Sequence, residues 1–140
     1  MTAVTLADIA SVDWSLKLGA IGEVVQGIAD VDQCIQIILT TPKGADPLRP
    51  TFGADLWRYI DYPANAAFPA LVREVTDAIT RWEPRVKVLS VKGAPAGSDY
   101  SQLIVTVSWQ LQLGAAPGPG QTTIVTLPAN SQNSNGKVKI

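Results

Sequence analysis

The sequence predicts an α+β fold in which helices pack on one face of a small, mainly antiparallel sheet. The first part of the chain carries apolar residues at helical spacing, and the later part carries apolar residues that alternate at every second position. Two helical segments that precede three consecutive strand-like segments are typical of this class, whereas a parallel sheet needs strands and helices in alternation. We therefore expect the order helix, helix, strand, strand, strand.

The chain is long enough for one domain. Its 140 residues allow a single hydrophobic core, and 46% hydrophobic with 16% charged residues is the composition of a folded chain. We expect this domain to span residues 21–128. Residues 1–20 would form an N-terminal arm that orders against a partner. Residues 129–140, rich in asparagine, serine and glycine, would form a flexible C-terminal tail.

Composition excludes several classes of function. The net charge is −1, so there is no electrostatic footprint for nucleic acid or for an anionic membrane. The chain has no histidine, which removes histidine-based triads, and its single cysteine, Cys34, allows no intrachain disulfide. We expect no metal and no cofactor. We expect no signal peptide, because Asp8 and Asp13 interrupt the apolar residues of the first segment, and no transmembrane helix, because the sequence has no run of 18 apolar residues.

The first regular elements are predicted to be a short strand and a helix. Residues 23–26 lie between two glycines and favour a strand. Asp30 then opens a helix as its N-cap, and Gln33 completes a pair of the capping-box type. Cys34 belongs to the apolar stripe of this helix, so we interpret it as a buried core thiol. The other members of the stripe are Val31, Ile35, Ile38 and Leu39.

A polar connector and two further helices follow. Residues 41–50 lack the glycine–lysine pattern of a phosphate loop, and their Lys43 and Arg49 either contact a partner or belong to a solvated loop. Residues 54–60 favour a short helix with Leu56, Trp57 and Ile60 inward. The longest helix is predicted over 64–82. Its apolar stripe comprises Phe68, Val72, Val75, Ile79 and Trp82, widened by Leu71 and Ala78.

Three strands are predicted after Pro84, whose ring ends the long helix. They span 86–92, 102–113 and 122–127, with turns at 93–99 and 114–120. The middle strand alternates most clearly, and its apolar face comprises Leu103, Val105, Val107, Trp109, Leu111 and Leu113. Core packing is therefore the favoured interpretation of Trp109. The strand near Ile124 is a candidate edge that accepts a strand from another chain.

Four short sequence motifs, taken in their order along the chain, carry a resemblance to a known protein family. They are GIADVDQCI at 27–35, ILTTPKG at 38–44, RPTFG at 49–53 and RWEPRV at 81–86. Together they resemble the W-like baseplate wedge family of contractile phage tails, which includes the TssE component of type VI secretion baseplates. The likeness covers about residues 20–113, and its Glu-Pro-Arg signature corresponds here to Glu83, Pro84 and Arg85.

The resemblance implies a structural subunit of the virion tail baseplate, assembled in the bacterial host cytoplasm. It would occur in several copies and join other wedge proteins around the tail hub, near tube-proximal proteins. It would also help the tail sheath protein begin its assembly by strand exchange at the sheet. The signature Glu83, Pro84 and Arg85 is implied to contact wedge partners. A type VI secretion-like baseplate subunit is the alternative that these residues leave open.

The physical chemistry of the signature allows two interpretations. Pro84 fixes a rigid corner between helix and strand, from which Glu83 and Arg85 either make charge-assisted bonds to a partner or pair with neighbouring groups. An enzyme, namely a peptidoglycan-cleaving tail lysozyme, is the remaining alternative, and we do not expect it. Glycoside hydrolysis needs two carboxylates, one with a raised pKa. Glu23 has no obvious acidic partner in the sequence, Glu74 falls on the polar side of the long helix, and pairing with Arg85 would lower the pKa of Glu83, which is the wrong direction for a general acid.

Overall fold

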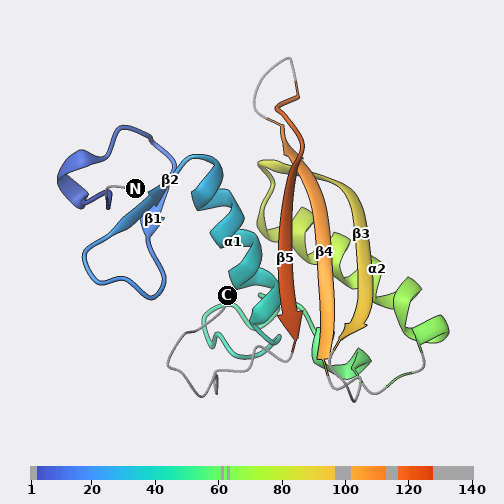
Figure 1. Cartoon of the computed structure of the whole chain (residues 1–140). Coiled ribbons are helices and arrows are strands. Elements are labelled where there is room, and N and C mark those ends of the chain that lie inside the picture. The colour runs from blue at the N-terminus through green and yellow to red at the C-terminus, as the bar shows by residue number, and fades with distance from the viewer. Residues whose placement is uncertain (1–2, 61, 63, 97–101, 113–116, 128–140) are drawn as a thin grey trace.

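The computed structural model describes residues 3–60, 62, 64–96, 102–112 and 117–127 (Figure 1). Within these residues two helices and a three-stranded sheet form the body, and a smaller lobe precedes them. The predicted α+β class is confirmed. No helix of the described part is long and apolar enough to cross a membrane. The predicted tail at 129–140 and the residue Leu113 lie outside the described residues.

The sheet of the body is antiparallel and has the order β3-β4-β5. Its strands are β3 (Val86–Ala96), β4 (Gln102–Leu111) and β5 (Gln121–Leu127). β3 extends four residues beyond the predicted end at 92, because residues 93–96 pair with β4 instead of forming a turn. Figure 1 shows α1 (Ile28–Thr40) beside β5, and α2 (Ala64–Trp82) behind β3 and β4.

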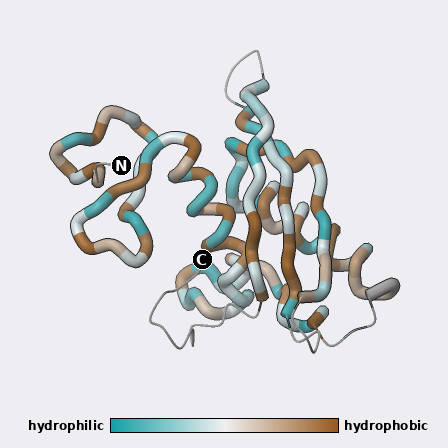
Figure 2. Tube along the Cα trace, viewed as in Figure 1, coloured by the Kyte–Doolittle hydropathy of each residue, from teal (hydrophilic) through white to brown (hydrophobic). Residues whose placement is uncertain are grey.

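The alternation of apolar and polar residues along β4 places one face of this strand in the core, as predicted. Its inward residues Leu103, Val105, Val107 and Trp109 are buried, whereas the residues between them are only partly covered. Figure 2 shows hydrophobic segments recurring along the sheet and the helices that face it. Burial of such side chains is the main favourable term in folding, at roughly 25 cal/mol per Å² of apolar surface. The periodicity of this strand therefore fixes which face of the sheet the helices cover.

The long helix α2 has the predicted bounds, but its buried stripe is centred differently. Leu71, Val75, Ala78 and Ile79 are the buried members, while Phe68, Val72 and Trp82 lie at the partly covered margins. The short helix predicted over 54–60 is a 3-10 helix at Leu56–Tyr59. Leu56 is fully buried as predicted, and Trp57 and Ile60 pack against the core from its edge.

Two predictions about α1 are wrong. The helix begins at Ile28 after Gly27, so Asp30 lies in its first turn and is not the N-cap. Cys34 is half-buried instead of lying in the core. The helix start is set at Gly27, whose positive φ of 59° turns the chain into the first residue of α1. Cys34 is only half-buried because this side of α1 faces polar groups from distant parts of the chain, Arg85 among them.

The N-terminal lobe, residues 3–26, is a small structure that lies beside α1, on the side away from the main sheet (Figure 1). Its strands β1 (Trp14–Leu16) and β2 (Val24–Gln26) pair antiparallel, and Thr5 forms a further bridge to Glu23. β2 begins one residue after the predicted start. The predicted division between residues 20 and 21 falls between these two paired strands, and the division into arm, domain and tail stays a prediction.

Candidate functional site

The corner between α2 and β3 is held by backbone bonds on both sides. Glu83 continues the helix through its N–H, which donates to the carbonyl of Ile79 at 2.8 Å. The N–H of Val86 then donates back to the carbonyl of Glu83 at 3.2 Å, and that of Gln112 donates to the carbonyl of Arg85 at 2.7 Å. Pro84, which has no N–H to satisfy, is the exposed residue of the turn. Backbone hydrogen bonds therefore hold the turn on both sides of Pro84, where the sequence predicts a rigid corner.

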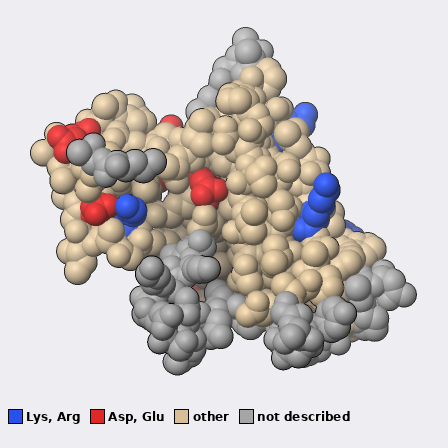
Figure 3. Space-filling view, in the orientation of Figure 1, with Lys and Arg blue, Asp and Glu red and all other residues tan. Residues whose placement is uncertain are grey.

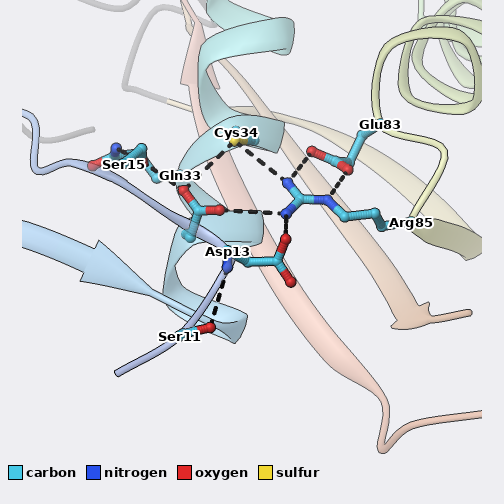
Figure 4. A network of polar contacts seen from close by, with 8 residues as sticks. Ser11, Asp13, Ser15, Gln33, Cys34, Glu83 and Arg85 are labelled. Carbon is cyan, nitrogen blue, oxygen red and sulfur yellow. Dashed lines mark hydrogen bonds and ion pairs between the residues drawn. The ribbon is translucent and has the colours of Figure 1, made fainter. Parts of the chain in front are cut away.

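Glu83 and Arg85 are joined to each other by a two-pronged ion pair (Figure 4). Arg85 Nε lies 2.6 Å from Glu83 Oε1, and Arg85 Nη2 lies 2.8 Å from Glu83 Oε2. Glu83 is only 4% exposed, so Arg85 is the counter-ion that offsets the cost of burying this carboxylate. The hydrogen bonds to Glu83, together with its negative charge, outweigh partial burial and raise the pKa of Arg85. The guanidinium is therefore always a cation.

Two aspartates complete the surroundings of Arg85. Nη1 lies 3.0 Å from Asp13 Oδ1, in the N-terminal lobe, and 3.4 Å from Asp30 Oδ2, on α1. A longer contact of 3.9 Å joins Nη2 to the sulfur of Cys34. One guanidinium thereby links the lobe, α1 and the corner after α2. The second interpretation of the signature, pairing with neighbouring groups, describes this arrangement.

Gln33 fastens the lobe to α1 at the outer edge of β1. Its amide nitrogen donates to the carbonyl of Leu16 at 2.8 Å, and its amide oxygen accepts from the N–H of Leu18 at 3.0 Å. The side chain thus makes the pair of bonds that a neighbouring strand would make. Ser15 adds a bond of 2.5 Å from its hydroxyl to Asp30 Oδ1. The two residues of the predicted capping box, Asp30 and Gln33, both bind the lobe.

The thiol of Cys34 is not placed as a nucleophile. Burial raises its pKa, and the nearby carboxylates of Asp30 and Glu83 raise it further, against the opposing effect of Arg85. A reactive cysteine needs the thiolate form, which a basic surrounding favours and this surrounding disfavours. No group of three or more histidine, cysteine, aspartate or glutamate residues suited to a metal ion is found in the described part of the chain.

Each glutamate of the described residues is paired with a basic side chain. Glu23 lies 2.7 Å from the ammonium of Lys17, and Glu74 lies 2.6 Å from that of Lys43. Burial raises the pKa of Glu74, but the bonds from Lys43 and from the N–H of Asp55 outweigh it, so the pKa is lowered. A general acid requires the opposite shift.

The two edges of the main sheet differ in chemistry. β3 carries Lys87, Lys92 and Pro95, residue types that protect an edge from pairing with another strand. β5 contains no charged residue and no proline, and Ile124 is 56% exposed on its outer face. In the view of Figure 3 the N-terminal lobe carries acidic groups and one basic group, a further acidic group lies near the middle of the face, and basic groups lie on the side of β3. Most of the remaining face in this view is uncharged.

The sequence-predicted site residues are together in space but differ in exposure. Pro84 is exposed, the Arg85 side chain is 25% exposed and Glu83 is buried. The sequence did not identify Asp13 as a member of this cluster, and Asp30 was predicted to be the N-cap of a helix. Asp13 and Arg85 are 72 positions apart, and no local pattern joins them.

Comparison with known proteins identifies the family of this fold. A family model described as baseplate wedge protein gp25 matches residues 25–115. The chain therefore belongs to this family of baseplate wedge proteins, and it is a baseplate component of a contractile phage-type tail.

Two curated relatives support the assignment. The chain is 30% identical over 110 residues to baseplate protein W of Escherichia phage P2, which covers 78% of the chain and 90% of that protein. It is 28% identical over 79 residues to baseplate wedge protein gp25 of Enterobacteria phage T4, which covers 56% of the chain and 60% of the T4 protein. The match thus spans less than two thirds of the T4 relative.

Solved baseplates contain chains with the same fold. A chain of the postcontracted baseplate of pyocin R2 superposes with a TM-score of 0.59 at 27% identity, over 71% of this chain and 99% of that one. A chain of the type VI secretion system baseplate complex superposes with a TM-score of 0.52 over 70% of this chain and 93% of that one, and its 19% identity shows likeness of fold alone.

Proposed function

We propose that the chain joins neighbouring wedge proteins around the tail hub through the corner of Glu83, Pro84 and Arg85. The observation that carries this proposal is the placement of a permanent cation on a rigid turn. Arg85 is fixed by the buried Glu83, keeps a quarter of its side chain exposed and stands beside the exposed Pro84. A guanidinium oriented in advance loses little freedom when it binds a partner.

A second surface of the proposal is the outer edge of β5, the last strand of the sheet in the part of the chain that the structure describes, where we place the start of the sheath. An edge strand offers unpaired N–H and C=O groups to a strand from another chain. The protected edge at β3 and the unprotected edge at β5 favour β5 for this addition. A phage tail is favoured over a type VI baseplate, because the identity is 30% to the P2 protein and 19% to the type VI chain.

The joining role is tested by capture of co-expressed proteins from neighbouring tail genes. The bait is the wild-type chain, Glu83→Ala/Arg85→Ala, or Lys87→Ala as a matched control that removes an exposed cation two residues away. We expect the double variant, checked for folding, to lose at least about tenfold in capture, since charge-assisted pairs at interfaces contribute about 2 kcal/mol or more. The control should bind as the wild type does.

Equal capture by the folded double variant would move the interface away from the corner. Absence of capture by the wild-type chain would refute the joining role. The sheath role is tested by Ile124→Lys, which places a charge on β5, against Leu89→Lys on β3, where the side chain is 50% exposed. Fewer sheathed tails in electron micrographs of Ile124→Lys alone would support addition at β5, and equal numbers would contradict it.

The same proposal makes the chain structural and not catalytic. Its support is the pairing of Glu23, Glu74 and Glu83 with basic side chains, which leaves the described part of the chain without a glutamate suited to act as a general acid. Purified protein should release no soluble fragments from peptidoglycan above the buffer blank. Release that disappears in Glu74→Gln would overturn this part of the proposal.

A further inference from the structure

The guanidinium of Arg85 has no N–H left for a partner in the structure described. An arginine carries five N–H donors. Here Nε and one N–H of Nη2 face Glu83, the second N–H of Nη2 faces Cys34, and the two of Nη1 face Asp13 and Asp30. A partner that bonds to Arg85 must therefore displace one of these groups.

The three carboxylates around Arg85 differ in burial and in the hydrogen bonds that hold them. Glu83 is buried and binds through both oxygens, and Asp30 is 3% exposed and also accepts a bond from Ser15. The side chain of Asp13 is 41% exposed and reaches Arg85 through one oxygen. An exposed single contact is screened by water and is the weakest kind of ion pair. Among the three carboxylates, Asp13 is thus the one that leaves at the smallest cost.

The backbone around Asp13 does not depend on its carboxylate. The carbonyl of Asp13 accepts from the N–H of Gly27 at 3.0 Å. Gln26 accepts from the N–H groups of Ala10 and Ser11 at 2.7 and 2.9 Å, which holds the preceding turn. Rotation of the Asp13 side chain would therefore free one N–H of Nη1 while the N-terminal lobe stays in place.

We propose that Asp13 occupies the position on Arg85 that a carboxylate of a wedge partner takes on assembly. The partner segment that fits this corner then presents an aspartate or glutamate side chain. One carboxylate replaces another, so Arg85 keeps the same number of negative neighbours and all of its N–H donors stay hydrogen-bonded. This inference rests on the joining role proposed above, and it adds the chemistry of the partner and an internal competitor for the same site.

The decisive variant is Asp13→Asn, which removes the competing charge and keeps the shape and the backbone bonds. The matched control is Asp8→Asn, which changes the charge of the same lobe equally, at a carboxylate bonded to Thr5 and not to Arg85. The probe is the set of wedge proteins purified from neighbouring tail genes, and the readout is the Kd for each variant. We expect Asp13→Asn to bind about two- to fivefold more tightly, as loss of an exposed ion pair predicts, and Asp8→Asn to match the wild type.

The other outcomes each decide the question. Weaker binding by Asp13→Asn would mean that the partner contacts Asp13 itself through a basic side chain, and equal binding would mean that Asp13 is not displaced; either result overturns the inference while the joining role stands. If neither the wild type nor Asp13→Asn binds any wedge protein, the joining role fails and the displacement fails with it. The gain in Asp13→Asn should disappear in Asp13→Asn/Arg85→Ala.

Discussion

The indole nitrogen of Trp109 donates a hydrogen bond of 2.8 Å to the hydroxyl of Thr123, and that hydroxyl donates in turn to the carboxylate of Asp32. This chain of bonds crosses from β4 through β5 to α1 inside the core. It satisfies a buried donor and fixes α1 against the sheet, since Trp109 and Thr123 are almost completely buried. The position of α1, which carries the N-terminal lobe, is therefore fixed by a polar contact as well as by apolar packing.

Replacing Thr123 by valine should destabilise the protein by about 1–3 kcal/mol, because the buried Trp109 donor loses its partner and the Asp32 carboxylate keeps only its bond from Gln36. Thr122→Val is the matched control, since Thr122 is exposed on the same strand. Urea unfolding followed by tryptophan fluorescence measures both variants. Equal midpoints for the two would show that the bond chain contributes nothing.

Arg85→Ala should cost about 3 kcal/mol of folding stability, the lower end of the range for removing one partner of a buried pair, since Arg85 is a quarter exposed. Glu83→Ala/Arg85→Ala should cost less than Arg85→Ala alone, because the buried carboxylate of Glu83 is then absent too. Lys87→Ala should stay near the wild type. Thermal unfolding at neutral pH tests the order, and a double variant that is less stable than Arg85→Ala would contradict it.

Gly53→Ala should destabilise the folded protein far more than Gly44→Ala does. Both glycines have positive φ, 106° and 88°, so either substitution costs about 1–2 kcal/mol in backbone conformation. A methyl group at Gly53 would also stand 2.0 Å from the carbonyl oxygen of Thr41, whereas nothing lies within 4 Å at Gly44. The difference between the two unfolding midpoints isolates this clash, and similar midpoints would refute it.

The ion pair of Lys43 and Glu74 should make the folding stability depend on pH in the acidic range. The pKa of Glu74 is lowered from its ordinary value of 4.5, so its contribution is fully present above that value and is lost as the pH falls through the lower folded-state pKa. The wild type should therefore exceed Glu74→Gln in stability at pH 7 and approach it near pH 3. Asp77→Asn, at a side chain that is 71% exposed, is the control. A constant difference between wild type and Glu74→Gln across this range would contradict the assignment.

The sequence by itself determined the fold class, the bounds of α2 and the inward face of β4. It did so because these elements are long enough for their 3.6- and 2-residue periods to be read locally. The four ordered phrases also indicated the family, which the family model then confirmed. Shorter or irregular elements were less predictable, and the segment 54–60 became a 3-10 helix.

Only the tertiary structure decided what the polar residues do. Asp30 and Gln33 have the spacing of a capping box, yet one binds Arg85 and the other binds the edge of β1. Glu83 and Arg85 could have faced outward, but they bind each other, and Arg85 also binds Asp13. A charged group pairs with whichever opposite charge the fold brings near, at any separation along the chain, and no period in the sequence records that choice.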